Sequence, residues 1–166
     1  MHALQRPRWQ RRASGFTLVE MVVVVAIVGV LAVAAQPLLA LTARRQQELT
    51  LRQNLRALRS AIDAHKAAAS EGRIPFPPGA SGYPPSLDAL VEGVSTSASG
   101  AVSSKVHFLR RMPRNPLADA ALPAAQTWAL RAYESPPDAP RPGRDVFDVY
   151  VDSDQRGLDG SAVREW

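Results

Sequence analysis

The sequence predicts an α+β protein, in which a long N-terminal α-helix, transmembrane in its first half, packs on a small C-terminal antiparallel β-sheet head. Three observations support this fold class: an apolar run near the N-terminus, leucines at helical spacing after it, and two alternating segments near the C-terminus. The chain has 166 residues, of which 46% are apolar, so it has room for one such head beside the helix.

The apolar run is long enough to cross a membrane. Between residues 16 and 35 only Thr17 and Glu20 are polar. At ~1.5 Å per residue, a helix of this length extends about 30 Å, the thickness of the hydrocarbon layer of a bilayer. The basic residues that precede the run are Arg6, Arg8, Arg11 and Arg12. By the positive-inside rule, the N-terminus therefore lies in the cytoplasm and the rest of the chain lies outside.

Two other interpretations of this run stay open. A plain signal anchor would tolerate Glu20 because the residue lies near the membrane interface. A cleavable secretory signal would use the small residues Ala32, Val33 and Ala34 as its cleavage site, and it would release a soluble protein after Ala34.

The helical pattern continues beyond Pro37, where we expect a kink or local melting because proline removes one backbone hydrogen bond. The apolar positions of the second half are Leu51, Leu55, Leu58 and Ile62. Their spacings of four, three and four residues place them on one face of a helix that extends to about Ala68. This stripe is predicted to pack against the head.

The head begins with a loop rich in proline and glycine. Ser86 is placed to cap a short helix that runs through Val91 and ends near Gly93. A polar tract at residues 95–104 predicts a mobile connection, and residues 105–113 predict another short helix.

Two segments of the head alternate apolar and polar residues, as half-buried strands do. The first covers residues 127–135 and the second residues 147–152. The inward side chains are predicted to be Trp128, Leu130, Ala132, Phe147, Val149 and Val151. A proline-rich connection at residues 136–142 would join them as an antiparallel pair.

Charge and composition exclude several functions. The net charge of +5 comes mainly from the arginines before the apolar run, so the rest of the chain is nearly neutral and gives no support for a nucleic-acid partner. Without cysteine there is no disulfide and no thiolate metal site. The three histidines (His2, His65 and His107) lack metal-ligand spacing, and no nucleophile or phosphate-binding motif is present, so we predict that the chain is not an enzyme.

The stretch GFTLVE, followed by the unbroken apolar run, resembles the class III signal of type IV pilins and type II secretion pseudopilins. The resemblance implies that a prepilin peptidase cleaves after Gly15 and methylates the new amino group of Phe16. Glu20 then matches the glutamate at position five of the mature proteins, and Pro37 falls at position twenty-two, where these helices commonly carry a proline.

The resemblance also implies the division of the chain. Residues 1–15 would be the leader, residues 16–41 the transmembrane and filament-core helix, residues 42–68 the amphipathic helix of the head, and residues 69–166 a periplasmic pilin-like α+β head.

A carboxylate within the membrane costs at least ~2.5 kcal/mol unless it finds a partner. The resemblance implies that Glu20 of an incoming subunit pairs with the amine of Phe16 on an adjacent subunit. Phe16, Glu20 and Pro37 are therefore the predicted subunit-assembly residues.

The C-terminal part carries a second resemblance. The stretches YPPSLDALV, RRMPRNP, TWALRAY and DVYVDSDQRGLDGSAVREW are similar to the G-type major pseudopilins of type II secretion, known as general secretion pathway protein G. That resemblance implies a calcium ion bound by a loop before the terminal tryptophan. The oxygen ligands would come from Asp152, Ser153, Asp154 and Asp159. The alternative is a solvated acidic turn whose charge Arg156 balances.

Together the resemblances imply a structural subunit of a type II secretion pseudopilus. It would be held in the inner membrane as a single-pass protein and would form a homo-oligomeric periplasmic filament that promotes protein export. Its partners would be minor pseudopilins, the prepilin peptidase, and an inner-membrane assembly platform with a cytoplasmic ATPase. The alternatives are a type IV pilus or DNA-uptake minor pilin, and a soluble periplasmic binding module released after Ala34.

Charge is divided unevenly between two parts of the chain. Residues 44–73 hold seven basic and three acidic side chains, whereas residues 138–165 hold seven acidic and four basic ones. Stacked copies could set the basic helix of one copy near the acidic loop of another. The alternative is an ordinary solvated surface.

Overall fold

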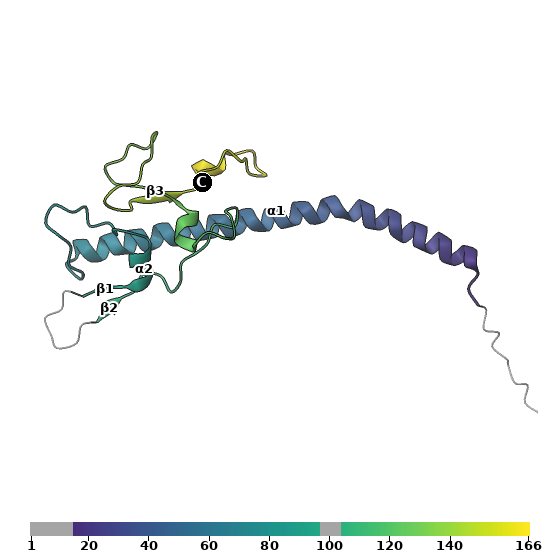
Figure 1. Cartoon of the computed structure of the whole chain (residues 1–166), viewed down its shortest axis with the longest axis horizontal. Helices are drawn as coiled ribbons and strands as arrows, with labels where there is room; N and C mark the ends of the chain where they lie inside the picture. The colour runs from purple at the N-terminus through teal and green to yellow at the C-terminus, as the bar shows by residue number, and fades with distance from the viewer. Residues whose placement is uncertain (1–14, 97–103) are drawn as a thin grey trace, which may run out of the picture. The chain divides into compact units, whose positions relative to one another are not determined.

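The computed structural model describes residues 15–96 and 104–166 (Figure 1). Its helices are α1 (Leu18–Ser70), α2 (Asp88–Glu92) and two 3-10 helices at Ala124–Thr127 and Val163–Glu165. Its strands are β1 (Val94–Ser95), β2 (Lys105–Val106), β3 (Ala129–Arg131) and β4 (Asp148–Tyr150). One long apolar N-terminal helix and small antiparallel sheets confirm the predicted α+β class. The leader up to Ser14 and most of the polar connection lie outside the described residues.

The chain divides into two compact units, residues 1–42 and residues 43–166. The first unit is helical from Leu18 onward and includes Pro37 without interruption. The predicted continuation of the helix past Pro37 is therefore confirmed, and no melted segment breaks it. Because proline lacks an N–H group, the carbonyl of Val33 loses its usual helical donor at this point.

The second unit is organised on the leucine stripe of α1. Leu51, Leu55, Leu58 and Ile62 are buried, as the spacing predicted. Each such side chain contributes roughly 1.5–3 kcal/mol when it is removed from water. The helix ends at Ser70, two residues beyond the predicted end.

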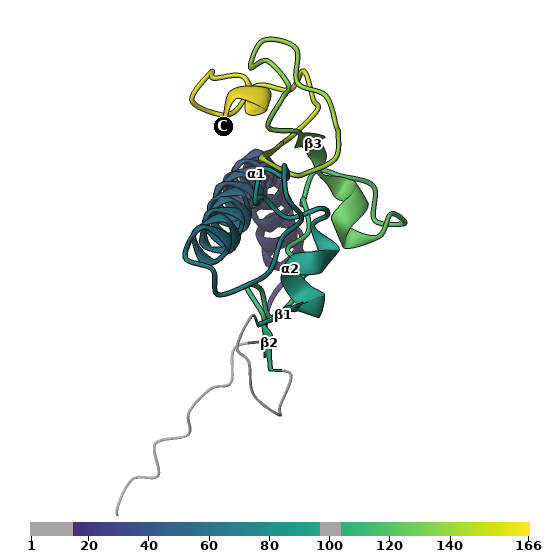
Figure 2. The same cartoon turned by 90° about the vertical axis from the view of Figure 1, so that its left-hand side faces the viewer.

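The stripe packs against residues from several later parts of the head, from α2 to the C-terminal 3-10 helix. The buried residues that complete this core are Leu87, Leu90, Trp128, Val146, Val149, Val151 and Val163. Viewed along α1, the head elements lie above the helix, to its right and below it, so they cover only part of its circumference (Figure 2). The uncovered side carries exposed residues such as Arg56, Ala57 and Ser60.

The predicted antiparallel pair is present as β3 and β4, with Leu130 opposite Val149. Trp128 and Ala132, which flank β3, are buried as expected. Each strand is three residues long, shorter than predicted. The prolines of the connecting segment (Pro136, Pro137, Pro140 and Pro142) explain the short ladder, since proline has no N–H to donate to it.

The predicted helix at residues 105–113 is wrong. Val106 instead pairs with Val94 in the β1–β2 ladder, and the N–H groups of Phe108 and Leu109 both donate to the carbonyl of Leu90, at 3.0 and 2.9 Å. A short segment ending at proline gains too few helical bonds to offset nucleation, so these tertiary bonds prevail.

The helix predicted after Ser86 is confirmed as α2. The hydroxyl of Ser86 accepts a hydrogen bond from the N–H of Ala89 at 3.3 Å. Gly93, which follows the helix, has a φ of 79°, a backbone conformation that favours glycine.

Candidate functional site

The residues that the sequence singled out for processing and assembly lie at the start of α1, except Pro37, which lies in the interior of the helix. Gly15 and Phe16 precede the helix in non-helical backbone and are exposed, so the peptide bond between them is accessible. Thr17 begins the helix by capping: its hydroxyl accepts a hydrogen bond from the N–H of Glu20 at 3.2 Å. Glu20 itself lies in the first turn.

The capping role of Thr17 was not predicted from the sequence. The signal was present, because Thr17 and Glu20 have the Thr-x-x-Glu spacing of a capping box. A carboxylate in the first turn also gains ~0.3–1 kcal/mol from the helix dipole. Glu20 is therefore placed favourably within its own helix, before any contact with another chain.

The apolar side chains that follow are all exposed. From Phe16 to Leu41 no residue is buried, and the most apolar window of α1 has a mean hydropathy of 2.8. The helix is long and apolar enough to cross a membrane. An uninterrupted apolar surface of this size requires lipid or protein around it. This fits a single-pass, membrane-anchored protein.

The C-terminal loop does not bring the predicted calcium ligands together. Asp152 and Asp154 both face Arg164, whose guanidinium nitrogen lies 3.9 and 3.6 Å from their carboxylate oxygens. The hydroxyl of Ser153 accepts a hydrogen bond from the N–H of Gln155. Within residues 15–96 and 104–166, no three acidic or histidine side chains form a group that could hold a metal ion.

Asp159, the remaining predicted ligand, binds other partners. One carboxylate oxygen accepts hydrogen bonds from the hydroxyl and the N–H of Ser161, at 2.6 and 3.0 Å. The other oxygen pairs with the guanidinium of Arg52. The bond from the Ser161 hydroxyl, followed by that from Arg52, lowers the pKa of Asp159 to about 2. In this arrangement the donor set does not fit a calcium site.

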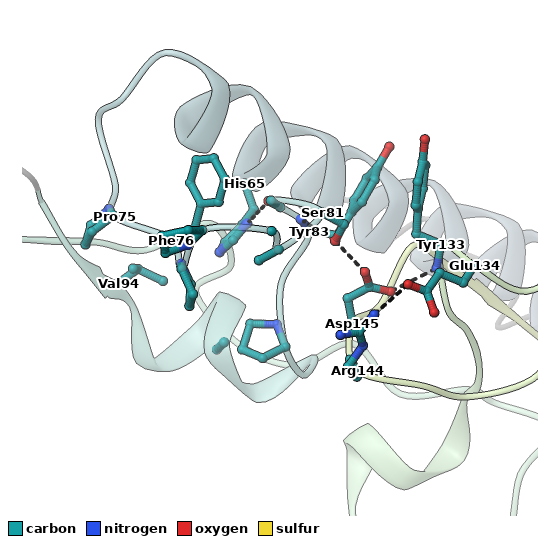
Figure 3. A pocket seen from close by; sticks show the side chains of 17 residues that line it. His65, Pro75, Phe76, Ser81, Tyr83, Val94, Tyr133, Glu134, Arg144 and Asp145 are labelled. Carbon is teal, nitrogen blue, oxygen red and sulfur yellow. Dashed lines mark hydrogen bonds and ion pairs between the residues drawn. The ribbon is translucent and has the colours of Figure 1, made fainter.

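A groove of about 620 Å³ opens on another part of the head (Figure 3). Its wall is mainly apolar and includes Pro75, Phe76, Tyr83 and Tyr133. The rings of Tyr83 and Tyr133 stack with their centroids 5.6 Å apart. Burial raises the pKa of the Tyr83 hydroxyl, and the nearby charge of Asp63 raises it further.

His65, Ser81 and Asp145 line this groove and are the residue types of a hydrolytic triad. Their contacts are those of a structural network. The Ser81 hydroxyl donates to Asp145, and Nδ1 of His65 lies 3.1 Å from the carbonyl of Gly82 (Figure 3). In the part of the chain that the structure describes, the hydrogen bond between nucleophile and base that such chemistry requires is not formed.

His65 is 4% exposed and packs against Phe108, with ring centroids 5.1 Å apart and ring planes tilted by 56°. Burial lowers the pKa of His65 below its usual value of 6.5, and the bond to Gly82 opposes this shift. A neutral imidazole therefore suits this position.

Comparison with known protein families matches residues 10–36 to the prokaryotic N-terminal methylation motif. This motif is the prepilin-type signal of type IV pilin-like proteins, and the match includes Gly15, Phe16 and Glu20. Comparisons with curated proteins and with solved structures gave no match. The motif indicates a type IV pilin-like protein, which implies processing by a prepilin peptidase and a structural role in a filament.

Proposed function

We propose that this chain is a pseudopilin, a subunit of a type II secretion pseudopilus that polymerises through its N-terminal helix. The observation that carries this proposal is the methylation motif at residues 10–36, on a helix whose apolar side chains are all exposed from Leu18 to Leu41. In the membrane, lipid covers this surface. In a filament, the same surface packs against the helices of neighbouring subunits.

Cleavage after Gly15 supplies the partner that Glu20 needs. In the described part of the uncleaved chain, the carboxylate of Glu20 forms no hydrogen bond or ion pair, although its backbone N–H is bound by Thr17. Removal of the leader creates a positively charged amine on Phe16 of every copy. Pairing of this amine with Glu20 of the next subunit would neutralise both charges as the subunits leave the bilayer.

The choice of a secretion filament over other filaments rests on the C-terminal half. The order of a Tyr-Pro start, a short helix, a proline-rich connector and a strand resembles G-type pseudopilins. The structure has α2 at Asp88–Glu92 and β3 at Ala129–Arg131 in that order. A minor pilin of a type IV pilus or of a DNA-uptake system is the second candidate, because the methylation motif is shared by all of these.

As a pseudopilin, the chain would lie in the inner membrane with its N-terminus in the cytoplasm and its head in the periplasm. We propose that it assembles with minor pseudopilins on an inner-membrane platform driven by a cytoplasmic ATPase. The filament would push exported proteins outward, and the chain itself would catalyse no reaction.

Mass spectrometry of the mature N-terminus tests this proposal. A chain that begins with methylated Phe16 supports a filament subunit, whereas a chain that begins at Ala35 would support a secreted binding module and contradict the proposal. Deletion of the gene in the native host then distinguishes a secretion pseudopilus from a type IV pilus or a DNA-uptake filament. Loss of extracellular enzymes supports a secretion pseudopilus, and loss of DNA uptake or surface pili supports the second candidate.

A further inference from the structure

The segment of residues 152–166, which we call the C-terminal loop, is fastened to α1 by charged side chains of the helix. We propose that the guanidinium of Arg52 is the cation around which this loop is organised, in the place where the resemblance implies a calcium ion. The proposal concerns the head alone and does not depend on which filament the chain forms.

Arg52 contacts two side chains of the C-terminal loop that are also linked to each other. Its guanidinium binds the carboxylate of Asp159 and lies over the ring of Trp166, with 4.0 Å between the guanidinium carbon and the ring centroid. The indole N–H of Trp166 donates to the hydroxyl of Ser161 at 2.6 Å, and that hydroxyl donates to Asp159 at 2.6 Å. One cation thus holds an acidic and an aromatic side chain that are themselves linked through Ser161.

Other residues on the same face of α1 extend the contact. Glu48, one turn before Arg52, accepts hydrogen bonds from the N–H of Leu158 at 3.0 and 3.2 Å. Arg44, one turn earlier again, donates to the carbonyl of Arg156 at 2.6 Å. Arg59, two turns after Arg52, donates to the carbonyl of Trp166 at 2.8 Å. Residues spaced by four and seven positions share a helix face, so a row of charges meets the loop.

A glycine in the C-terminal loop, Gly157, allows the ring of Trp166 to pack closely against the loop backbone. A side chain at Gly157 would place its Cβ 2.4 Å from the Trp166 ring and 2.8 Å from an Asp159 carboxylate oxygen. Gly157 also donates its N–H to the carbonyl of Ser161 at 2.9 Å, which closes the turn. The glycine is therefore required at this close approach.

Arg52 and a calcium ion compete for the same carboxylate. Both oxygens of Asp159 are already bound, one by Ser161 and the other by Arg52. Calcium needs about six to eight oxygen ligands, so it would have to displace Arg52 and draw Asp152 and Asp154 away from Arg164. The ion pair of Arg52 with Asp159 thus joins the basic part of α1 to the acidic C-terminal part within one chain. A contact of these two parts between copies stays a prediction.

Amide hydrogen exchange of the full chain in detergent micelles tests this proposal. In the wild-type protein, adding calcium or a chelator should leave the exchange of Leu158 and Val163 unchanged, because no metal holds the loop. In Arg52→Gln these amides should exchange roughly tenfold faster, since one charge-assisted bond is lost. The amide of Val149 in β4 should keep its protection, which shows that the head is still folded.

Two further variants keep the result interpretable. Arg45→Gln removes an exposed charge from the same helix and should leave the exchange of Leu158 unchanged. Asp159→Asn should resemble Arg52→Gln, and the double variant should exchange no faster than either single one, because both remove the same contact. Slower exchange of Leu158 on addition of calcium to the wild type, or unchanged exchange in Arg52→Gln, would overturn the proposal.

Discussion

The hydroxyl of Thr17 accepts a hydrogen bond from the backbone N–H of Glu20 at 3.2 Å, so Glu20 takes part in the start of its own helix. Two roles of this residue must therefore be separated: its backbone N–H completes the cap, and its carboxylate is the proposed partner of the Phe16 amine on another subunit.

Glu20→Gln separates the two roles, because it keeps the cap and removes the charge. We expect normal cleavage and methylation but no filaments, measured by mass spectrometry and by cross-linking of membrane fractions. Thr17→Val is the matched control. It removes the cap, at a cost of ~0.5–2 kcal/mol to the helix start, and should still assemble. Filaments of normal length from Glu20→Gln would refute the pairing with Phe16.

The leucine stripe should dominate the stability of the head. Leu55 is 1% exposed, so Leu55→Ala should lower the free energy of unfolding by about 2–5 kcal/mol in urea titrations of the full chain in detergent. Leu49 lies on the same helix and is 49% exposed, so Leu49→Ala should have a much smaller effect. Equal effects of the two substitutions would contradict the packing described for α1.

His65 should make the head sensitive to mild acid. Burial lowers its pKa in the folded state below 6.5, so the folded head binds a proton less readily than the unfolded chain. The resulting stability is fully present above pH 6.5 and is lost as the pH falls through the folded-state pKa. Thermal unfolding between pH 7.5 and 5 measures this slope. His65→Gln should reduce the dependence of thermal stability on pH, whereas substitution of the exposed His107 should leave that dependence unchanged. The reverse outcome would refute the role given to His65.

The contribution of Asp159 to stability should be lost at a much lower pH than that of His65. Its folded-state pKa of about 2 lies below the ordinary value of 3.8, so its contribution is present above pH 3.8 and is lost as the pH falls toward 2. Exchange of the Ser161 amide, which donates to Asp159, should therefore accelerate only below pH 3.8, relative to the amide of Val146, which donates to the carbonyl of Pro84. In Asp159→Asn that relative acceleration should disappear. A wild-type loop that opens at pH 5 would contradict the contacts of Asp159 with Ser161 and Arg52.

Local pattern was sufficient to predict much of this molecule. The spacing of Leu51, Leu55 and Leu58 predicted the buried face of α1, and alternation around Leu130 and Val149 predicted an antiparallel pair. Both predictions succeed because the spacing of apolar residues that are close together in the sequence indicates which face of a helix or strand is buried. The strand ends were predicted less well, because prolines of the connecting segment end the ladder early.

The features that the sequence did not predict depend on contacts between residues that are far apart in the sequence. Val106 forms a strand because Val94 offers it a ladder, and Phe108 is held by the carbonyl of Leu90. The resemblance of this loop to G-type pseudopilins implied that its carboxylates bind calcium. In the structure Asp159 instead meets Arg52, and no local pattern connects these two residues.

The separation of Arg52 and Asp159 along the chain is 107 residues, and this has a consequence for the order of folding. Closing so long a segment is entropically costly until the intervening strands and turns are in place, so this contact should form among the last. For the same reason it should be among the first to open when the head begins to unfold, so we expect a protease to cleave the C-terminal loop first.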